Sequence, residues 1–400
     1  MPLFKKMNYK VCLLLLGFLF VRIVMFMTTP FLAVYLSSKN FSPIEIGYII
    51  SVNPLSNVIV CLFSGYFVSK ISPRISIGII PIIWGGIFFG FYFSSTFIEF
   101  LILNMLNGIS YSIFEPALKR SLSMLSSSEN KLLVFNLRYT AINVGALLGT
   151  MLSIVYKTQT TLFPYLILGI VYVVYGITNF CIFSSLQISN TAIKKNYTFI
   201  NAISDLFSDK FFTHLIIGMT ICYIGYSQFT STISEYLAKD FIKDGINFYS
   251  MLLTLNAITV LALQYPILNA LKRINSYVVM ILSNIFIATG LLLFGLSTIK
   301  CVLALAIIIF SIGELLIGSR LDVLLDELSN SNPSLAGLYF SGAEIIKIGK
   351  FFGPIISGYL ISYFTFNSHI IIFLLLSLIT LTGIINYIYL ISISKSNIWH

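Results

Sequence analysis

The segment from Gly313 to Gly358 reads GELLIGSRLDVLLDELSNSNPSLAGLYFSGAEIIKIGKFFGPIISG. Two apolar stretches flank a polar turn at 329–334, and their charged side chains include Glu314, Glu344, Lys347 and Lys350. A charged side chain surrounded by hydrocarbon costs at least ~2.5–3.5 kcal/mol. A chain retains such a charge where it is paired or lines a wet pathway. The segment therefore predicts two facing membrane helices with functional charges.

Composition restricts the class of protein. Hydrophobic residues make up 58% of the chain, charged residues 10%, and the mean hydropathy is +0.95. These values indicate an all-α membrane protein with many spans. The net charge of +10 then points to basic loops at a lipid bilayer, and we expect no nucleic-acid partner. The cysteines lie in apolar runs without paired spacing, so we expect neither disulfides nor a metal site.

Twelve apolar stretches of roughly 20–28 residues are each long enough to cross ~30 Å of hydrocarbon. We expect these spans at 10–36, 44–70, 75–95, 98–124, 130–156, 163–186, 212–238, 245–270, 275–297, 300–327, 333–363 and 368–392. The longest loop, 187–210, is the natural linker between residues 1–186 and residues 211–400. The sequence thus predicts twelve transmembrane helices in two six-helix halves.

Lysine and arginine are distributed unequally between the two sides of this arrangement. If both termini are cytoplasmic, the outer loops receive Lys39, Lys157, Lys239, Lys243 and Lys300. The inner side receives Lys5, Lys6, Lys10, Lys70, Arg74, Lys119, Arg120, Lys131, Arg138, Lys194, Lys195, Lys210, Lys272, Arg273, Arg320 and Lys395. The positive-inside rule predicts a multi-pass protein of the cell (inner) membrane, with both termini and the 187–210 linker in the cytoplasm.

The two halves repeat one another. The matching pairs are Tyr35-Leu36 with Tyr236-Leu237, Ser51-Val52-Asn53 with Thr254-Leu255-Asn256, Gly108 with Gly313, and Gly145-x-x-x-Gly149 with Gly349-x-x-x-Gly353. Halves that run in the same direction imply a parallel repeat, and transporters of that design bind substrate between the halves near the midplane. Small residues four apart let helices approach closely, so we expect packing contacts at Gly145, Gly149, Gly349 and Gly353, with a bend at Pro354.

The loop after the second expected span resembles a motif of the major facilitator superfamily. It reads Gly65-Tyr-Phe-Val-Ser69-Lys70-Ile-Ser-Pro73-Arg74, similar to the loop signature G-x-x-x-D-R-x-G-R, with Ser69 and Pro73 in place of the acid and the second glycine. The run from Gly349 to Gly358 resembles the antiporter signature of the bacterial multidrug-efflux branch. The resemblance implies the major facilitator fold, drug:proton antiport and a gating loop that includes Gly65, Lys70 and Arg74.

One departure from the family concerns proton transfer. Asn104 in the fourth span stands where the family often has an arginine linked to proton transfer. That route is therefore not carried over to this chain, and other ionisable side chains become the candidates.

The candidates are the ionisable side chains inside the spans: Arg22, Glu115, Glu314, Glu344, Lys347 and Lys350. Measured from the inner ends of their spans, Arg22 and Glu115 lie ~18 and ~14 Å deep, and Glu314 and Lys347 ~20 and ~21 Å deep. We therefore expect Arg22 and Lys347 as the charge partners of Glu115 and Glu314. Either these pairs are static, or at least one acid exchanges protons as its partner moves. The resemblance places spans four and ten at the central cavity, which favours Glu314 and Glu115 over Glu344 as proton carriers.

Polar and aromatic side chains at other span positions predict the substrate cavity. The candidates are Phe26, Asn53, Asn143, Tyr223, Tyr226, Gln228 and Asn256. Amide and aromatic groups suit amphiphilic, often cationic compounds through stacking and cation–π contacts. With 35 Phe and 23 Tyr in the chain, most aromatic side chains nevertheless face lipid or neighbouring helices.

These observations predict a proton-coupled secondary active exporter of small amphiphilic compounds that works by alternating access. Two alternatives remain: a dedicated exporter of a siderophore or peptide natural product, and an importer of a small metabolite. An enzyme is disfavoured because the chain has only 3 histidines and no candidate catalytic cluster. The chain has no phosphate-binding loop of the G-x-x-x-x-G-K-S/T type, which argues against an ATP-driven pump. We expect a monomer without a cofactor, whose partners are its substrate, protons and lipid.

Overall fold

The computed structural model describes residues 8–70, 72, 74–126, 131–156, 160–183, 206–238, 244–271, 273–331, 339, 342–365 and 368–396. Within these residues the chain forms helices and no strand. Eleven helical stretches among them are long and apolar enough to cross a membrane. The expected all-α membrane fold is confirmed, while most of the expected linker at 187–210 lies outside the described residues.

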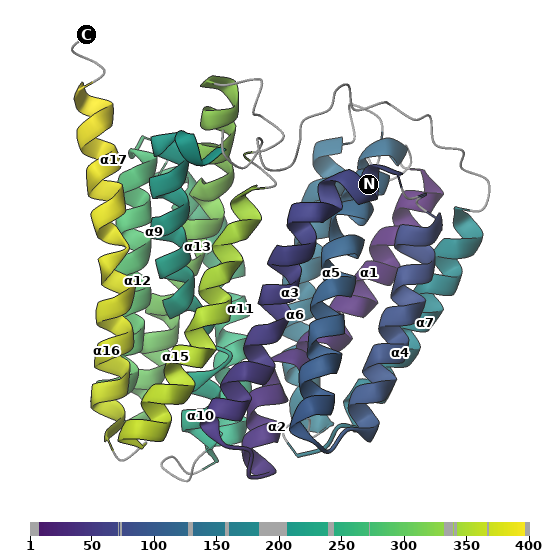
Figure 1. Ribbon diagram of the computed structural model, residues 1–400, viewed down its shortest axis with the longest axis horizontal. Coiled ribbons are helices and arrows are strands. Elements are labelled where there is room, and N and C mark those ends of the chain that lie inside the picture. Colours follow the sequence, from purple (N-terminus) through teal and green to yellow (C-terminus); the bar gives the residue numbers. More distant parts are fainter. Residues whose placement is uncertain are drawn as a thin grey trace.

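The helices form two bundles that stand side by side (Figure 1). The first bundle contains α1 (Tyr9–Thr28), η2 (Thr29–Phe31), α2 (Leu32–Ser38), α3 (Pro43–Lys70), η3 (Arg74–Ile79), α4 (Ile80–Phe93), α5 (Phe97–Leu125), α6 (Lys131–Val155) and α7 (Phe163–Ile182). The second contains α9 (Lys210–Ser227), α10 (Thr232–Ala238), α11 (Gly245–Ala270), α12 (Ser276–Leu296), α13 (Lys300–Ser331), η5 (Ala343–Lys347), α15 (Ile348–Phe364), α16 (His369–Thr382) and α17 (Ile384–Ser396).

Polar caps mark the beginnings of several spans. Thr96 and Glu99 form a capping box at the start of α5, in which the Glu99 carboxylate accepts from the Thr96 backbone N–H at 2.9 Å. The side chains of Asp209 and Asn275 cap α9 and α12. Each cap satisfies backbone N–H groups that have no partner inside the helix. These polar residues therefore fix where the apolar runs enter the membrane.

Each bundle has its own hydrophobic core. The first core gathers aromatic side chains around Trp84, which packs against Phe88 and Tyr172 at ring-centroid distances of 6.0 and 4.6 Å. The second core contains Phe310 and Phe373 among its buried side chains. The second core also takes in Phe31 and Val34, from η2 and α2 of the first bundle, so apolar surface is buried between the bundles there as well.

The first and seventh spans are interrupted at corresponding places. In the first, η2 with Pro30 separates α1 from α2, because proline cannot donate a helical backbone hydrogen bond. In the seventh, a turn at 228–231 separates α9 from α10. This interruption, together with Lys210 and His214 in α9, explains why the seventh span is not among the eleven continuous apolar helices.

Glycines bring equivalent helices together in both halves. A side chain at Gly149 would collide with the Ile23 carbonyl of α1, and one at Gly353 would meet the Ile224 carbonyl of α9. Gly145 and Gly349, one turn earlier, lie equally close to these two helices. The same contact recurs between spans one and five and between spans seven and eleven, as expected for a parallel repeat.

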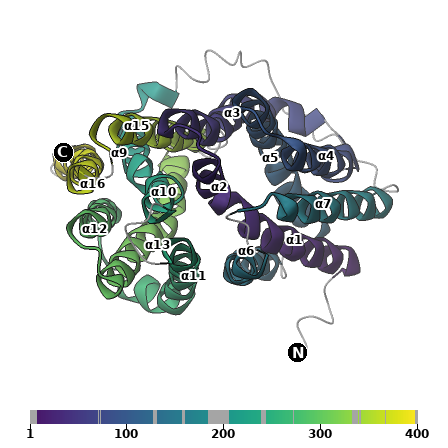
Figure 2. The same cartoon turned by 90° about the horizontal axis from the view of Figure 1, so that it is seen from below.

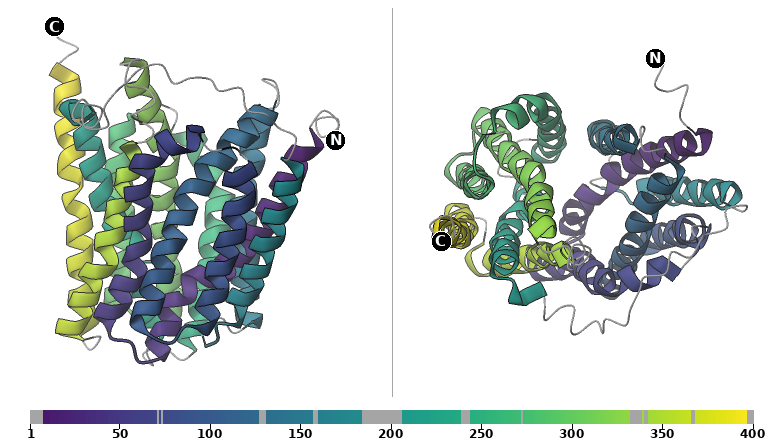
Figure 3. Two further views of the ribbon diagram at one scale, coloured as in Figure 1. Left: turned by 45° about the vertical axis from the view of Figure 1, so that its right-hand side comes forward. Right: turned by 90° about the horizontal axis from the view of Figure 1, so that it is seen from above.

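The two bundles meet mainly at the end of the molecule away from the termini. There the Tyr48 and Tyr359 hydroxyls lie 2.9 Å apart, and the Thr150 and Thr254 hydroxyls 3.1 Å apart. The Tyr249 hydroxyl donates to the Pro30 carbonyl at 3.4 Å. Figure 1 shows the bundles converging at this end and diverging at the end where both termini lie. Figure 2, seen from below, and the right panel of Figure 3, seen from above, show the same division into two bundles.

Candidate functional site

The first half holds one buried carboxylate between two guanidinium groups. Arg22 of α1 and Glu115 of α5 are 7% and 4% exposed, and they form an ion pair. Arg138 of α6 forms a second ion pair with the other Glu115 oxygen. Both guanidinium carbons lie over the Phe18 ring, at 4.5 and 5.3 Å from its centroid. Three helices of the first half therefore converge on Glu115.

The Arg22–Glu115 pairing expected from sequence is confirmed, and the assignment of Arg138 to the cytoplasmic surface is wrong. Arg138 lies two turns inside α6, where its side chain is 13% exposed. Arg138 lies within the expected span 130–156, which indicated a place inside the bundle, but it was counted among the loop charges. With two cations beside it, Glu115 is fully compensated as a carboxylate.

The second half holds Glu314 differently. The Tyr226 hydroxyl of α9 donates to Glu314 Oε1 at 2.9 Å. The Asn256 amide of α11 donates to Glu314 Oε2 at 2.9 Å and to the Ser311 hydroxyl at 2.8 Å. Neutral donors from two helices thus hold an acid carried by α13. Glu314, Tyr226 and Asn256 are each half-buried, so they retain accessible surface.

Lys347 connects the two halves. Its ammonium pairs with Glu344 within η5, donates to Asn57 Oδ1 of α3 at 2.8 Å, and lies 5.0 Å from the centre of the Tyr111 ring of α5. The expected Glu314–Lys347 pair is therefore replaced by a Lys347–Glu344 pair. The depth estimate does not give the direction in which the Lys347 side chain leaves its helix. That direction depends on the tight 3-10 turn that the chain forms at Ala343–Lys347.

Lys350 lies next to the Glu314 site. Its ammonium is 5.1 Å from the centre of the Tyr223 ring and 4.6 Å from that of Tyr226. Gly349 places α15 against α9 at this level, because any side chain there would collide with the Thr220 carbonyl. The close approach brings the Lys350 side chain onto the two tyrosine rings. Lys350 is half-buried.

The remaining cavity candidates have different positions. Asn53 is half-buried and donates to Asn104 Oδ1 at 3.4 Å. Asn143 is half-buried. Phe26 is half-buried beside Gly149. These three side chains belong to the half-buried polar and aromatic surface of the first half.

Gln228 was expected in the cavity, and this expectation is wrong. Its side chain is 0% exposed, donates to the Ile224 carbonyl at 2.7 Å and accepts from the Thr232 hydroxyl at 2.6 Å. It therefore replaces backbone hydrogen bonds that the turn between α9 and α10 leaves open. The sequence could have indicated this role, since Gln228 is followed by the polar run Thr230 to Thr232.

Sequence reasoning also missed two residues with distinct positions. Asn57, which receives Lys347, lies four residues after Asn53 and thus on the same face of α3. Glu235 in α10 is 2% exposed. It directly precedes the repeated Tyr236-Leu237 pair inside the expected span 212–238, and this was the available signal.

The expected gating loop is described only in part. α3 ends at Lys70 and contains Gly65, but the side chains of 61–71 lie outside the described residues. Arg74 begins η3 and is exposed, with its guanidinium 3.9 Å from the centre of the Phe180 ring of α7. The described part of this loop lies at the end of the molecule where both termini are found (Figure 1).

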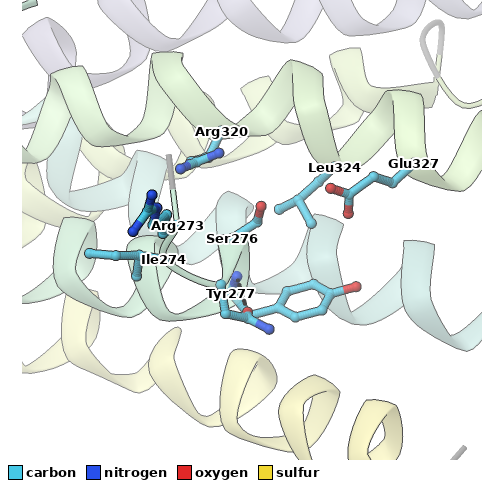
Figure 4. A pocket seen from close by; sticks show the side chains of 8 residues that line it. Arg273, Ile274, Ser276, Tyr277, Arg320, Leu324 and Glu327 are labelled. Atoms are coloured by element: carbon cyan, nitrogen blue, oxygen red, sulfur yellow. Dashed lines mark hydrogen bonds between the residues drawn. The ribbon is translucent and has the colours of Figure 1, made fainter. Parts of the chain in front are cut away.

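A polar pocket of about 410 Å³ lies on the second half, between the α11–α12 turn and the end of α13 (Figure 4). Arg273, Tyr277, Arg320 and Glu327 are among its lining residues. Arg320 donates to the Leu271 carbonyl at the end of α11, which is a favourable position for a cation. The pocket faces the end with the termini and is separate from the Glu314 site. No group of three or more potential metal ligands occurs among the described residues.

Comparisons with known proteins agree with this architecture. The family model described as "Major Facilitator Superfamily" matches residues 14–345. YqjV of Bacillus subtilis (strain 168), an uncharacterized MFS-type transporter, is 33% identical over 374 residues, covering 93% of this chain and 91% of that protein. YdeE of Escherichia coli (strain K12), also an uncharacterized MFS-type transporter, is 22% identical over 352 residues, covering 83% of each.

Solved structures share the fold at low sequence identity. A mutant of the nucleoside transporter NupG matches with a TM-score of 0.81 at 15% identity, covering 96% of this chain and 99% of that chain. A POT family transporter in complex with a thioalcohol conjugated peptide matches with a TM-score of 0.77 at 13% identity, covering 96% of each chain. At these identities the likeness concerns the fold alone.

Proposed function

Because the chain belongs to the Major Facilitator Superfamily, we propose that it is a proton-coupled secondary active exporter of small amphiphilic compounds. Substrate binds between the halves, and the two bundles alternate between access from either side of the membrane. With the termini in the cytoplasm, the conformation described here is closed on the outer side. An inward flow of protons drives the cycle.

The contrast between the two buried acids supports Glu314 as the proton-coupling residue. Glu115 forms ion pairs with two guanidinium groups, so its protonation would leave two buried cations without a partner. Glu314 accepts from the hydroxyl of Tyr226 and the amide of Asn256. Neutral donors impose a smaller penalty on protonation, because no buried charge loses its partner. Glu314 therefore exchanges protons, and the Arg22–Glu115–Arg138 cluster remains ionised throughout the cycle.

Glu344 has a different role in this proposal. Its ion pair with Lys347 lies where Lys347 also reaches Asn57 in the other half. Separation of the halves must break the Lys347–Asn57 hydrogen bond. Glu344 then keeps the Lys347 charge compensated while the two bundles move.

Dye accumulation in a host that lacks its own drug pumps tests the proposal. The probes are ethidium as a cation, fluorescein as an anion and Nile red as a neutral compound. Expression should lower accumulation of at least one dye, and a protonophore should abolish the effect. Glu314→Gln, which mimics the protonated acid, should also abolish gradient-driven efflux while the variant remains in the membrane. Efflux that survives the protonophore, or that Glu314→Gln leaves intact, would contradict proton coupling through Glu314.

A further inference from the structure

We propose that Glu314 and Lys350 form a dipolar binding site for zwitterionic substrates, in which Lys350 receives the anionic group and Glu314 the cationic group. The inference rests on the proposed function of the Glu314 site and specifies the class of amphiphile that it binds. It assigns to Lys350 a contact with substrate.

The first observation is that Lys350 and Glu314 contact two different parts of one tyrosine, the face of the Tyr226 ring and its hydroxyl. The Lys350 ammonium lies 4.6 Å from the centre of the Tyr226 ring, and the hydroxyl of the same tyrosine donates to Glu314 at 2.9 Å. A base and an acid are thus held beside each other but separated by a phenol group. Among the described residues, no carboxylate lies within 4.0 Å of the Lys350 ammonium.

The second observation is that the other charges nearby already have partners. Glu344 pairs with Lys347 inside η5. The carboxylate of Glu115 is used by Arg22 and Arg138 in the other half. Within the described part of the second half, Lys350 and Glu314 are therefore opposite charges at this level that form no ion pair within 4.0 Å.

The third observation is chemical complementarity. Neutral donors and aromatic faces compensate an ion less well than an opposite charge does. A ligand with one charge would satisfy one of the two residues and leave the other uncompensated. A ligand with a cationic and an anionic group about one aromatic ring apart would satisfy both, and the site would remain electrically neutral. Half-burial of Lys350, Tyr226 and Glu314 leaves surface for such a ligand.

The arrangement also agrees with antiport. The cationic group of the ligand and a proton compete for the same carboxylate, Glu314. Binding of the anionic group to Lys350 adds affinity without involving the coupling residue. Lys350 thereby determines specificity, while Glu314 determines both specificity and coupling.

A matched set of four para-substituted benzene derivatives tests this site. The zwitterion is 4-(aminomethyl)benzoate, and its comparators are 4-methylbenzoate, 4-methylbenzylamine and the methyl ester of the zwitterion. Binding to the purified full chain at pH 6.5, where Lys350 carries its charge, is measured by isothermal titration calorimetry. We expect the zwitterion to bind at least about tenfold more tightly than each comparator, as one additional charge-assisted contact implies. Equal or tighter binding of any comparator to the unmodified protein would overturn the proposal without reference to a variant.

Variants then assign the two ends of the ligand. Lys350→Gln should remove the preference for the zwitterion over its methyl ester, and Lys350→Arg should retain it. Glu314→Gln should remove the preference for the zwitterion over 4-methylbenzoate. Lys300→Gln is the matched control, because Lys300 also lies over an aromatic ring, that of Phe248 at 5.6 Å, but is exposed at the start of α13. An unchanged ratio in Lys350→Gln contradicts the assignment.

This experiment is independent of proton coupling. Preferential zwitterion binding together with dye efflux that ignores the protonophore would remove the coupling mechanism and leave the binding site. Proton-driven efflux together with weak zwitterion binding would remove the dipolar site and leave the coupling mechanism.

Discussion

The interiors of the two halves differ although their helices pack alike. In the first half, Arg22, Glu115 and Arg138 join three helices through ion pairs. In the second half, Glu314 joins three helices through hydrogen bonds from Tyr226 and Asn256. Glycine contacts, by contrast, recur at equivalent positions in both. The comparison indicates that the repeat fixes how closely the backbones approach, while the chemistry between them is set independently in each half.

The difference has an energetic meaning. Removing one member of a buried ion pair costs about 3–5 kcal/mol, because a charge is left without compensation. Removing one hydrogen bond between a neutral donor and a carboxylate costs about 1.5–3 kcal/mol. Loss of a single partner should therefore destabilise the ion-pair cluster of the first half more than the Glu314 site of the second half.

The largest effect is expected at Glu115. Glu115→Gln leaves Arg22 and Arg138 buried without a carboxylate, so the variant should lose about 3–5 kcal/mol of stability. Thermal unfolding of the purified protein measures the loss. The triple variant Arg22→Gln/Glu115→Gln/Arg138→Gln should lose less than the sum of the single losses. Additive losses would show that the three side chains do not act as one cluster.

Substitution of the packing glycines should have the next largest effect, and it should be equal in the two halves. Gly149→Leu and Gly353→Leu each force a side chain into a backbone carbonyl of the adjacent helix, at a cost of about 1–3 kcal/mol. Folded yield in detergent is the measurement. Gly86→Leu and Gly318→Leu are controls, since a side chain at these positions meets nothing within 4 Å. Similar losses for controls and test variants would contradict a packing role.

Glu314→Gln should have a small effect on stability and a large effect on coupling. Glutamine accepts from one donor and carries no charge, so the free energy of unfolding should fall by no more than about 3 kcal/mol. Uphill transport of whichever dye the cells export is measured in proteoliposomes with an imposed pH gradient. Downhill exchange of the same dye serves as the control. Stability losses matching those of Glu115→Gln would mean that the two halves hold their acids in the same way.

The smallest effect is expected where the halves touch. Thr254→Val removes the 3.1 Å hydroxyl contact with Thr150, at a cost below ~1 kcal/mol. Because the contact joins the halves, its loss should increase hydrogen exchange at the nearby end of α11. Thr259→Val is the control, since the Thr259 hydroxyl bonds to the Leu255 carbonyl of its own helix at 2.7 Å. Equal exchange in both variants would show that the contact does not hold the halves together.

The scaffold could be predicted from sequence because it depends on one-dimensional patterns. Apolar length gave the spans, and equal spacing of glycines gave the helix contacts around Gly149 and Gly353. The Arg22–Glu115 pair followed from depth, because two opposite charges at one level of a bundle have few other partners.

The second-half site could not be predicted to the same extent. Partner choice there depends on the direction in which each side chain leaves its helix, and the 3-10 turn at η5 changes that direction for Lys347. The contact of Lys350 with Tyr226 depends on the interhelical distance set by Gly349. Gln228 could not be assigned for a related reason. A glutamine that hydrogen-bonds to free backbone groups at a helix break looks the same in the sequence as a glutamine that lines a cavity.

The position of Arg22 has a consequence for biosynthesis. The first span emerges from the ribosome carrying Arg22, whereas Glu115 follows in the fourth span and Arg138 in the fifth. Until then the first span must enter the bilayer with an unpaired charge, at a cost of at least ~2.5–3.5 kcal/mol. The apolar run from Val11 to Phe20 offsets that cost. Insertion of the first helix and its final stability therefore depend on different residues, and the ion pairs form only when the fourth and fifth helices arrive.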